Sequence, residues 1–154
     1  MPTNFAQLAK SALIEELEQL RAAVHELADP LTDGEVWTRP LDPGNSIGHL
    51  LLHLTGNLSH FVGAQLGKTG YVRNREREFT ENQPPPRAKV FTDFDAAVAT
   101  FRRVVEGLSE QQLQAPHPEA RFGTVYKALV HLVSHFALHR GQMSYIVRLV
   151  KPAK

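Results

Sequence analysis

The sequence contains no cysteine among its 154 residues. Disulfide bonds, thiolate metal ligands and a cysteine nucleophile are therefore excluded, and any metal ion must be held by nitrogen and oxygen atoms. Neither sign of charge dominates, because 17 basic and 16 acidic side chains leave a formal net charge of +1. This balance argues against a general nucleic-acid-binding protein, in which a basic surface should prevail.

Long apolar runs are also missing. No stretch is long enough to span a bilayer, and residues 1–30 carry acidic side chains throughout, unlike a signal peptide. We therefore expect a cytoplasmic protein with no membrane partner. The length is that of a single domain, which we expect to cover residues 1–154 and to bury a normal core.

Apolar residues recur at helical spacing in four segments, and no segment shows the alternation of a strand. The first predicted helix has its apolar stripe over 13–27 and is closed by Pro30, and the second runs from a cap at Asn45 or Ser46 to about Gly67. The third is capped by Thr92 or Asp93 and has its apolar stripe over 94–108. The fourth runs from about Thr124 to about Val150. The expected fold class is all-α, a four-helix bundle.

The longest polar stretch, from Lys68 to Val90, contains four arginines and three consecutive prolines. This composition predicts an extended crossover between the second and third helices. The connections after the first and third predicted helices resemble one another, since 31–36 and 108–113 each form a short capped turn with an apolar residue at both ends. We therefore expect two similar helix pairs with pseudo-twofold character.

Three histidines follow one another at intervals of four: His131, His135 and His139. A helix turns about 100° per residue, so all three imidazoles share one face. The second predicted helix carries a comparable polar strip, with His49, Asn57 and His60 within about 40° of His53. Both strips border apolar residues, as expected for side chains that line a cleft between helices, and histidines four apart can bind one transition-metal ion.

The position along each helix favours His135, His139 and His53 as metal ligands. His49 and His131 lie nearer the helix starts, so we expect them either around the metal ligands without binding the ion or on the protein surface. No carboxylate lies beside the histidines on either helix, which excludes the two-histidine, one-carboxylate arrangement of non-haem iron. Three neutral imidazoles with an open fourth position are typical of catalytic zinc, and nickel also fits. The alternative without metal is a cleft of hydrogen-bonded histidines that titrate near neutral pH.

Three segments together resemble the DinB/YfiT-like family of metal-dependent proteins. The first consists of residues 45–53 preceded by Trp37 and Pro40, and the second is the run 135–142. The third, residues 73–79, looks like a segment of an uncharacterised subfamily within the family. The resemblance covers nearly the whole chain. It implies a four-helix bundle with a long crossover between helices two and three, a homodimer, and a divalent metal ion on His53, His135 and His139.

Characterised members of that family include transferases and isomerases that use bacillithiol, mycothiol or glutathione, and others with hydrolase-like activity. The leading hypothesis is therefore a metal-dependent thiol S-transferase, whose partners are a small-molecule thiol and an electrophilic substrate. Metal binding lowers the pKa of a thiol, and the cosubstrate would supply the nucleophile that the chain lacks. We expect Arg73, Arg75 and Arg77 of the crossover to bind a carboxylate or phosphate of either substrate.

Two alternatives stay open. A metal-dependent hydrolase would activate water and needs a general base, for which the candidates are Glu76, Glu78, Glu81, His49, His60 and His131. A non-catalytic, stress-associated metal-binding bundle would close the site with a fourth protein ligand, His49 or His131. Of the remaining residues, Trp37 is expected to pack on the bundle end, and His25 and His117 to lie on the surface.

Overall fold

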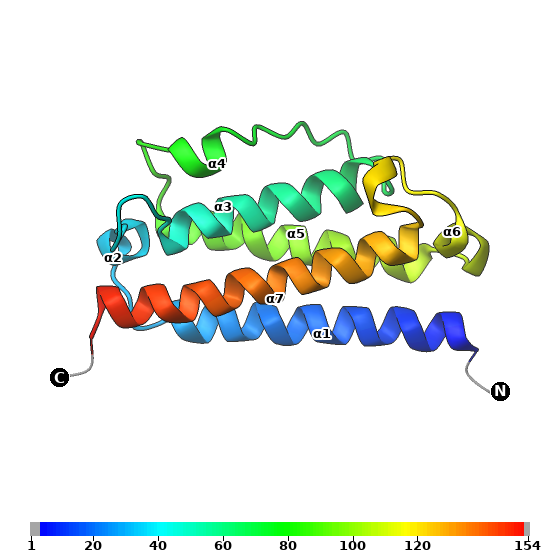
Figure 1. The fold of residues 1–154 in the computed structure, drawn as a ribbon, viewed down its shortest axis with the longest axis horizontal. Helices are drawn as coiled ribbons and strands as arrows, with labels where there is room; N and C mark the ends of the chain where they lie inside the picture. The colour runs from blue at the N-terminus through cyan, green and yellow to red at the C-terminus, as the bar shows by residue number, and fades with distance from the viewer. Residues whose placement is uncertain (1–3, 153–154) are drawn as a thin grey trace.

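A computed structural model describes residues 4–152 as helices joined by loops (Figure 1). The elements in chain order are α1 (Phe5–Ala28), α2 (Asp33–Trp37), α3 (Ile47–Leu58), the π-helix η1 (Ser59–Ala64), α4 (Arg77–Thr80), α5 (Arg87–Gly107), α6 (Glu110–Gln114), the 3₁₀ turn η2 (Ala120–Phe122) and α7 (Val125–Val150). Between residues 4 and 152 the only β-type pairing is an isolated bridge of Pro116 with Thr124. The all-α prediction is confirmed.

The four long helices α1, α3, α5 and α7 form the bundle (Figure 1). Within the bundle, α1 and α3 each pack against α5 and α7 rather than against each other. Helices that follow one another in the chain, α1 then α3 and α5 then α7, therefore occupy opposite corners, and neighbours come from different halves of the sequence. This arrangement places α3 beside α7, which brings the two histidine strips face to face.

Side-chain caps fix most helix starts where the sequence predicts them. Ser46 and Thr124 cap α3 and α7 by accepting a backbone N–H three residues later, at 3.1 and 3.2 Å. The two short connections are also confirmed, because α2 and α6 each begin with a capping box, on Thr32 and Ser109. The similar caps support the pseudo-twofold relation between the two halves of the chain.

The predicted start of the third long helix, at Thr92 or Asp93, is wrong. Helix α5 begins at Arg87, directly after Pro86, because proline lacks the N–H that an earlier helical turn would need. The Thr92 hydroxyl lies inside the helix and donates to the Ala88 carbonyl oxygen at 2.8 Å. Asp93 accepts a hydrogen bond from Lys89 one turn earlier, also at 2.8 Å.

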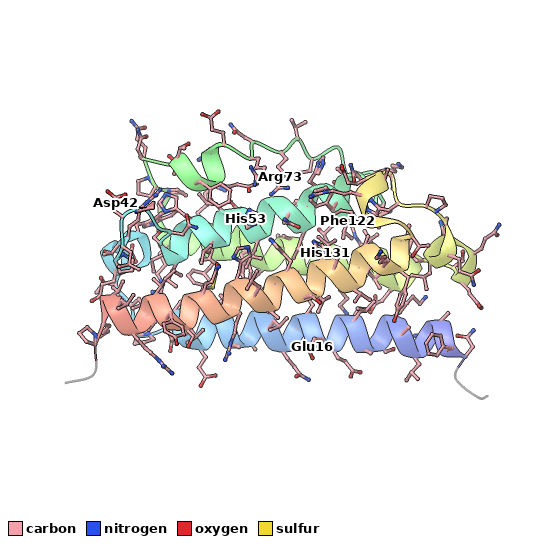
Figure 2. The ribbon with its side chains drawn as sticks, in the orientation of Figure 1. Glu16, Asp42, His53, Arg73, Phe122 and His131 are labelled. Atoms are coloured by element: carbon pink, nitrogen blue, oxygen red, sulfur yellow. The ribbon has the colours of Figure 1, made fainter. Side chains whose placement is uncertain are left out.

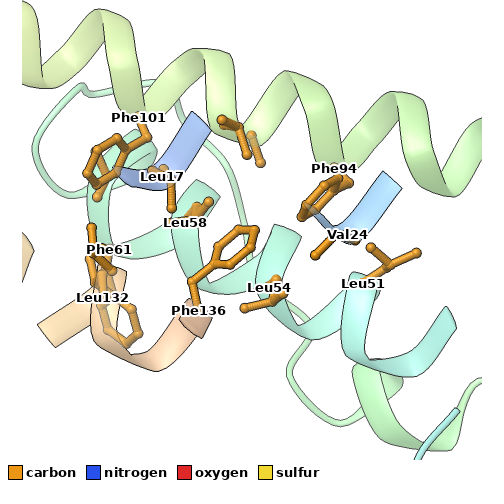
Figure 3. Packing of buried hydrophobic residues seen from close by; sticks show 14 of the residues in the cluster. Leu17, Val24, Leu51, Leu54, Leu58, Phe61, Phe94, Phe101, Leu132 and Phe136 are labelled. Carbon is orange, nitrogen blue, oxygen red and sulfur yellow. The ribbon is translucent and has the colours of Figure 1, made fainter. Parts of the chain in front are cut away.

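A continuous apolar core fills the space between the four helices (Figure 3). Its largest side chains, Phe94, Phe101 and Phe136, are almost completely buried. Trp37 packs on the first turn of α3, where a Cβ at Gly48 would overlap the indole ring, so the predicted packing at the bundle end is confirmed. Within residues 4–152, no helix is long and apolar enough to cross a membrane.

The crossover between α3 and α5 is confirmed and passes over α3, carrying α4 in its middle (Figure 1). At Gly56 the crossover approaches the α3 backbone so closely that an added Cβ would overlap the carboxylate of Glu78. Glycine at this position therefore lets a side chain from the crossover reach the face of α3 that carries His53.

Candidate metal centre

His53 from α3 meets His135 and His139 from α7 at the interface of the two helices. The Nε2 atom of His135 lies 3.2 Å from that of His53 and 3.0 Å from that of His139. One nitrogen from each ring can be chosen so that all three lie within 4.8 Å of one another. Two nitrogens bound to one tetrahedral zinc ion at 2.0–2.1 Å are roughly 3.3 Å apart, so the observed spacing fits a shared ion.

Polar groups behind two of the rings fix which nitrogen carries the proton. Nδ1 of His53 lies 2.8 Å from a carboxylate oxygen of Glu78, so it must be the N–H donor. Nδ1 of His139 donates to the amide oxygen of Gln142 at 2.7 Å. In a neutral imidazole the other nitrogen, Nε2, then keeps its lone pair, and both lone pairs point toward His135.

The environment keeps two of the triad imidazoles neutral. Burial lowers the pKa of His135 to about 3, with further contributions from the neighbouring His139 and His53. Burial also lowers the pKa of His139, although its hydrogen bond to Gln142 opposes the shift. Neutral imidazole is the form that binds a metal ion, so these rings are ready to ligate near neutral pH. An N–H on His135 can donate to one of the two lone pairs, whereas a cation between the rings can bind all three imidazoles, so the donor set fits a divalent ion.

Glu78 comes from α4 in the crossover and is almost fully buried. Arg73 binds both of its oxygens, through Nε at 2.6 Å and a terminal nitrogen at 2.9 Å. Burial alone would raise the pKa of Glu78, but the hydrogen bonds from His53 and Arg73 outweigh it and lower that pKa. An ionised Glu78 therefore orients His53 from behind.

The other two candidate bases of the crossover do not reach the triad. Glu81 pairs with Arg77, and the hydrogen bond from Arg77 is the main reason that the pKa of Glu81 is lowered. Glu76 is exposed. The helices carry no carboxylate beside the histidines, as predicted, yet the crossover supplies one that spacing along a helix could not reveal.

His49, considered both as a base and as a fourth ligand, lies away from the triad. It is buried, with Nδ1 2.6 Å from the Ser46 hydroxyl and Nε2 3.1 Å from the Glu81 carbonyl oxygen and 3.0 Å from Arg39. Burial lowers its pKa, and the charge of Arg39 adds to the effect. The ring is thus committed to tying the start of α3 to the crossover.

Three further histidines have separate places. His131 is exposed and lies parallel to His135, with ring centroids 6.2 Å apart. His60 is half-buried beside Phe61, and burial lowers its pKa. His117, expected on the surface, is buried instead, because its ring is 3.0 Å from the Phe61 carbonyl oxygen and accepts the Glu119 N–H at 2.9 Å.

His25 is half-buried rather than fully on the surface. Its Nε2 atom lies 2.7 Å from a carboxylate oxygen of Asp95, which also accepts from Arg21. This cluster joins α1 to α5 and lies apart from the triad.

A cavity of about 150 Å³ adjoins the triad. Its lining includes His53 and His135, two of the three crossover arginines, and residues near the start of α7. The full lining is His53, Asn57, Phe61, Arg73, Arg75, Arg121, Phe122, His131 and His135. Figure 2 shows Arg73 above His53, with Phe122 and His131 toward the η2 end.

Of the three crossover arginines, Arg73 and Arg75 line this cavity and Arg77 does not. Arg77 borders a larger cavity, of about 710 Å³, which is also lined by Leu52 and Thr55 of α3. Sequence reasoning missed Arg121, which lies in a 3₁₀ turn with no periodic pattern. It also gave Gln142 no role, although Gln142 shares the helical face of the three histidines.

Comparison with known proteins shows that the model of the Mycothiol-S-transferase family matches residues 12–150. No curated protein matches the sequence significantly.

Two solved structures share the fold. The crystal structure of a conserved protein from Enterococcus faecalis matches with a TM-score of 0.74 and 19% identity, over 96% of this chain and 98% of that one. YfiT from Bacillus subtilis, described as a probable metal-dependent hydrolase with an unusual four-helix bundle topology, matches with a TM-score of 0.70 and 17% identity, over 95% of this chain and 89% of that one. These likenesses establish the four-helix bundle.

Proposed function

The chain belongs to the mycothiol-S-transferase family, and we propose that it is a metal-dependent thiol S-transferase with His53, His135 and His139 as ligands of a divalent ion. One observation carries the proposal: imidazoles from two helices converge within 4.8 Å, and two of them are oriented from behind, by Glu78 and Gln142. Three imidazoles without a thiolate ligand suit zinc or nickel.

A divalent ion with an open fourth position lowers the pKa of a thiol, so that thiolate is available near neutral pH. The thiol must come with the cosubstrate, because the chain contains no cysteine. In the transfer step the sulfur forms a new bond to the electrophilic carbon, and the leaving group departs with its electron pair. This step needs no protein base, which agrees with a site where the carboxylate beside His53, that of Glu78, is already bound to Arg73 and His53.

Calorimetric titration with low-molecular-weight thiols tests the proposed function. Zinc- or nickel-loaded protein should bind at least one thiol, and the heat should disappear in metal-free protein and in a His135→Ala variant. If no thiol binds the metal-loaded protein, a thiol transferase is the wrong assignment.

A second candidate is a metal-dependent hydrolase, which the fold shared with YfiT supports. It requires a group that takes a proton from water, and Glu78 is held in an ion pair. His131, exposed beside His135, is the free imidazole nearest to the triad that lines the cavity. Hydrolysis of a nitrophenyl ester without thiol, abolished by a chelator and reduced in His131→Gln, would favour this candidate; no chelator-sensitive hydrolysis would eliminate it.

A further inference from the structure

The cavity beside the histidine triad is rich in arginine and contains no carboxylate among its lining residues. Glu78 contacts two of the lining residues, and its carboxylate is fully used by them, Arg73 and His53. Arg75 forms no ion pair within residues 4–152, and Arg121 has one loose pair, to Glu119 at 3.5 Å, at an exposed position. The lining therefore carries more positive charge than the neighbouring side chains neutralise.

Aromatic rings lie against the guanidinium groups of Arg75 and Arg121. Arg121 lies over Phe122 at 4.7 Å and over Phe61 at 5.3 Å, and Arg75 lies over Phe79 at 5.6 Å. Stacking of this kind restricts the guanidinium plane while leaving its N–H groups free to donate. Ordered guanidinium groups match the two oxygens of a carboxylate particularly well.

Asn57 provides an independent sign that a ligand belongs in the cavity. The residue is 8% exposed and lines the cavity, but its Oδ1 atom has no hydrogen-bond partner. Leaving a buried amide oxygen unpaired is unfavourable, so such groups usually meet a partner. An ionised carboxylate has no N–H or O–H to offer this oxygen, so Asn57 binds it only when the amide rotates and its N–H₂ group donates to a ligand oxygen.

We infer that this cavity is a subsite for the carboxylate of a small-molecule substrate, bound by Arg75, Arg121 and Asn57 beside the metal ligands. The inference rests on the proposed function, because the substrate would extend from the subsite to the triad. At about 150 Å³ the cavity is smaller than the 300–1,000 Å³ typical of whole drug-sized ligands. It therefore suits one charged group of a substrate.

A matched pair of thiols tests the subsite. We would titrate zinc-loaded protein with 3-mercaptopropionate and with 3-mercaptopropanamide, which differ in a carboxylate and a neutral amide. The acid should bind more tightly, and Arg121→Gln and Arg75→Gln should each weaken its binding about tenfold, the effect of losing one hydrogen bond to a charged group, while amide binding stays the same. Arg121→Lys should restore part of the affinity, because it keeps the charge but not the planar fork.

Arg77→Gln serves as the control, because Arg77 belongs to the same crossover and lies outside this cavity. It should leave both affinities unchanged. Equal binding of the two thiols, with no effect of either cavity arginine, overturns a subsite for the thiol. Equal losses for acid and amide in the arginine variants also overturn it, since they would reflect a general defect.

Succinate, titrated into the same zinc-loaded protein, separates the remaining cases. If succinate affinity falls in Arg121→Gln and Arg75→Gln while the thiols show no preference, the carboxylate belongs to the electrophile and the subsite stands. If no thiol binds but succinate depends on the two arginines, the proposed transferase fails and the subsite stands. If succinate is indifferent to both arginines and the thiols show no preference, the subsite is wrong.

Discussion

The buried bond between Glu78 and His53 gives the sharpest prediction. Glu78 and Arg73 side chains are only 5% and 10% exposed, and the pair is bidentate. A Glu78→Gln substitution keeps the size of the side chain but removes its charge. The amide can still accept from His53 through one oxygen, but its N–H₂ group then faces the N–H groups of Arg73.

The expected cost follows from burial. Removing one partner of a buried ion pair typically costs about 3–5 kcal/mol, because the other charge stays buried without compensation. Glu78→Gln should therefore lower the free energy of unfolding of metal-free protein by about 3 kcal/mol. Loss of a group that orients a metal-bound histidine typically weakens metal binding about 10–100-fold, so zinc affinity should fall within that range.

Urea unfolding measures the first effect, and competition with a chromophoric chelator measures the second. Glu76→Gln is the matched control, because this exposed glutamate lies in the same crossover and should change stability by less than about 0.5 kcal/mol. A folded Glu78→Gln protein that binds zinc within twofold of wild type would refute the role of Glu78 in positioning His53.

Three further predictions follow from the site and its surroundings. Gly56→Ala should displace the Glu78 carboxylate and weaken zinc binding in the chelator assay. Gly34→Ala is the control, because its added Cβ meets no neighbouring atom and should leave zinc binding unchanged. Equal effects of the two variants would contradict the close approach of Glu78 to the α3 backbone. Burial lowers the pKa of His49 in the folded protein, so below about pH 6.5 the unfolded protein binds more protons than the folded one. In urea titrations, the stability advantage of metal-free wild type over His49→Gln should therefore shrink as the pH falls from 7 to 5. A stability difference that stays constant over this range would contradict the prediction. Zinc at 100 times its dissociation constant should stabilise wild type by about 2.7 kcal/mol in thermal unfolding and leave His139→Ala nearly unchanged; equal stabilisation would point to zinc binding elsewhere.

Periodic patterns account for the part of the fold and site that could be predicted. The four-residue spacing of His135 and His139 survives folding because α7 is regular there, and the caps at Ser46 and Thr124 fix where each helix begins. With both starts fixed, the depth of His53 along α3 follows from the sequence. The meeting of His53 with the α7 histidines could therefore be anticipated before the structure.

Contacts made by irregular segments could not be predicted in the same way. Glu78 and Arg121 reach the triad and its cavity from a crossover and a 3₁₀ turn, where no period relates sequence position to direction in space. His117, flanked by prolines, suggests an exposed loop, but a hydrogen bond to the distant Phe61 carbonyl oxygen buries it. Pro86 marks the start of α5 better than the later polar residues, because proline limits the turn before it.

Elemental analysis of protein purified without a histidine tag tests the central claim most directly. Wild type should contain about one divalent ion per chain, and His53→Ala and His135→Ala should each lose it, because each variant removes one of the three converging imidazoles. His49→Ala provides the comparison, since its ring is turned away from the triad. Metal content that stays the same in His53→Ala and His135→Ala would contradict the assignment of this site.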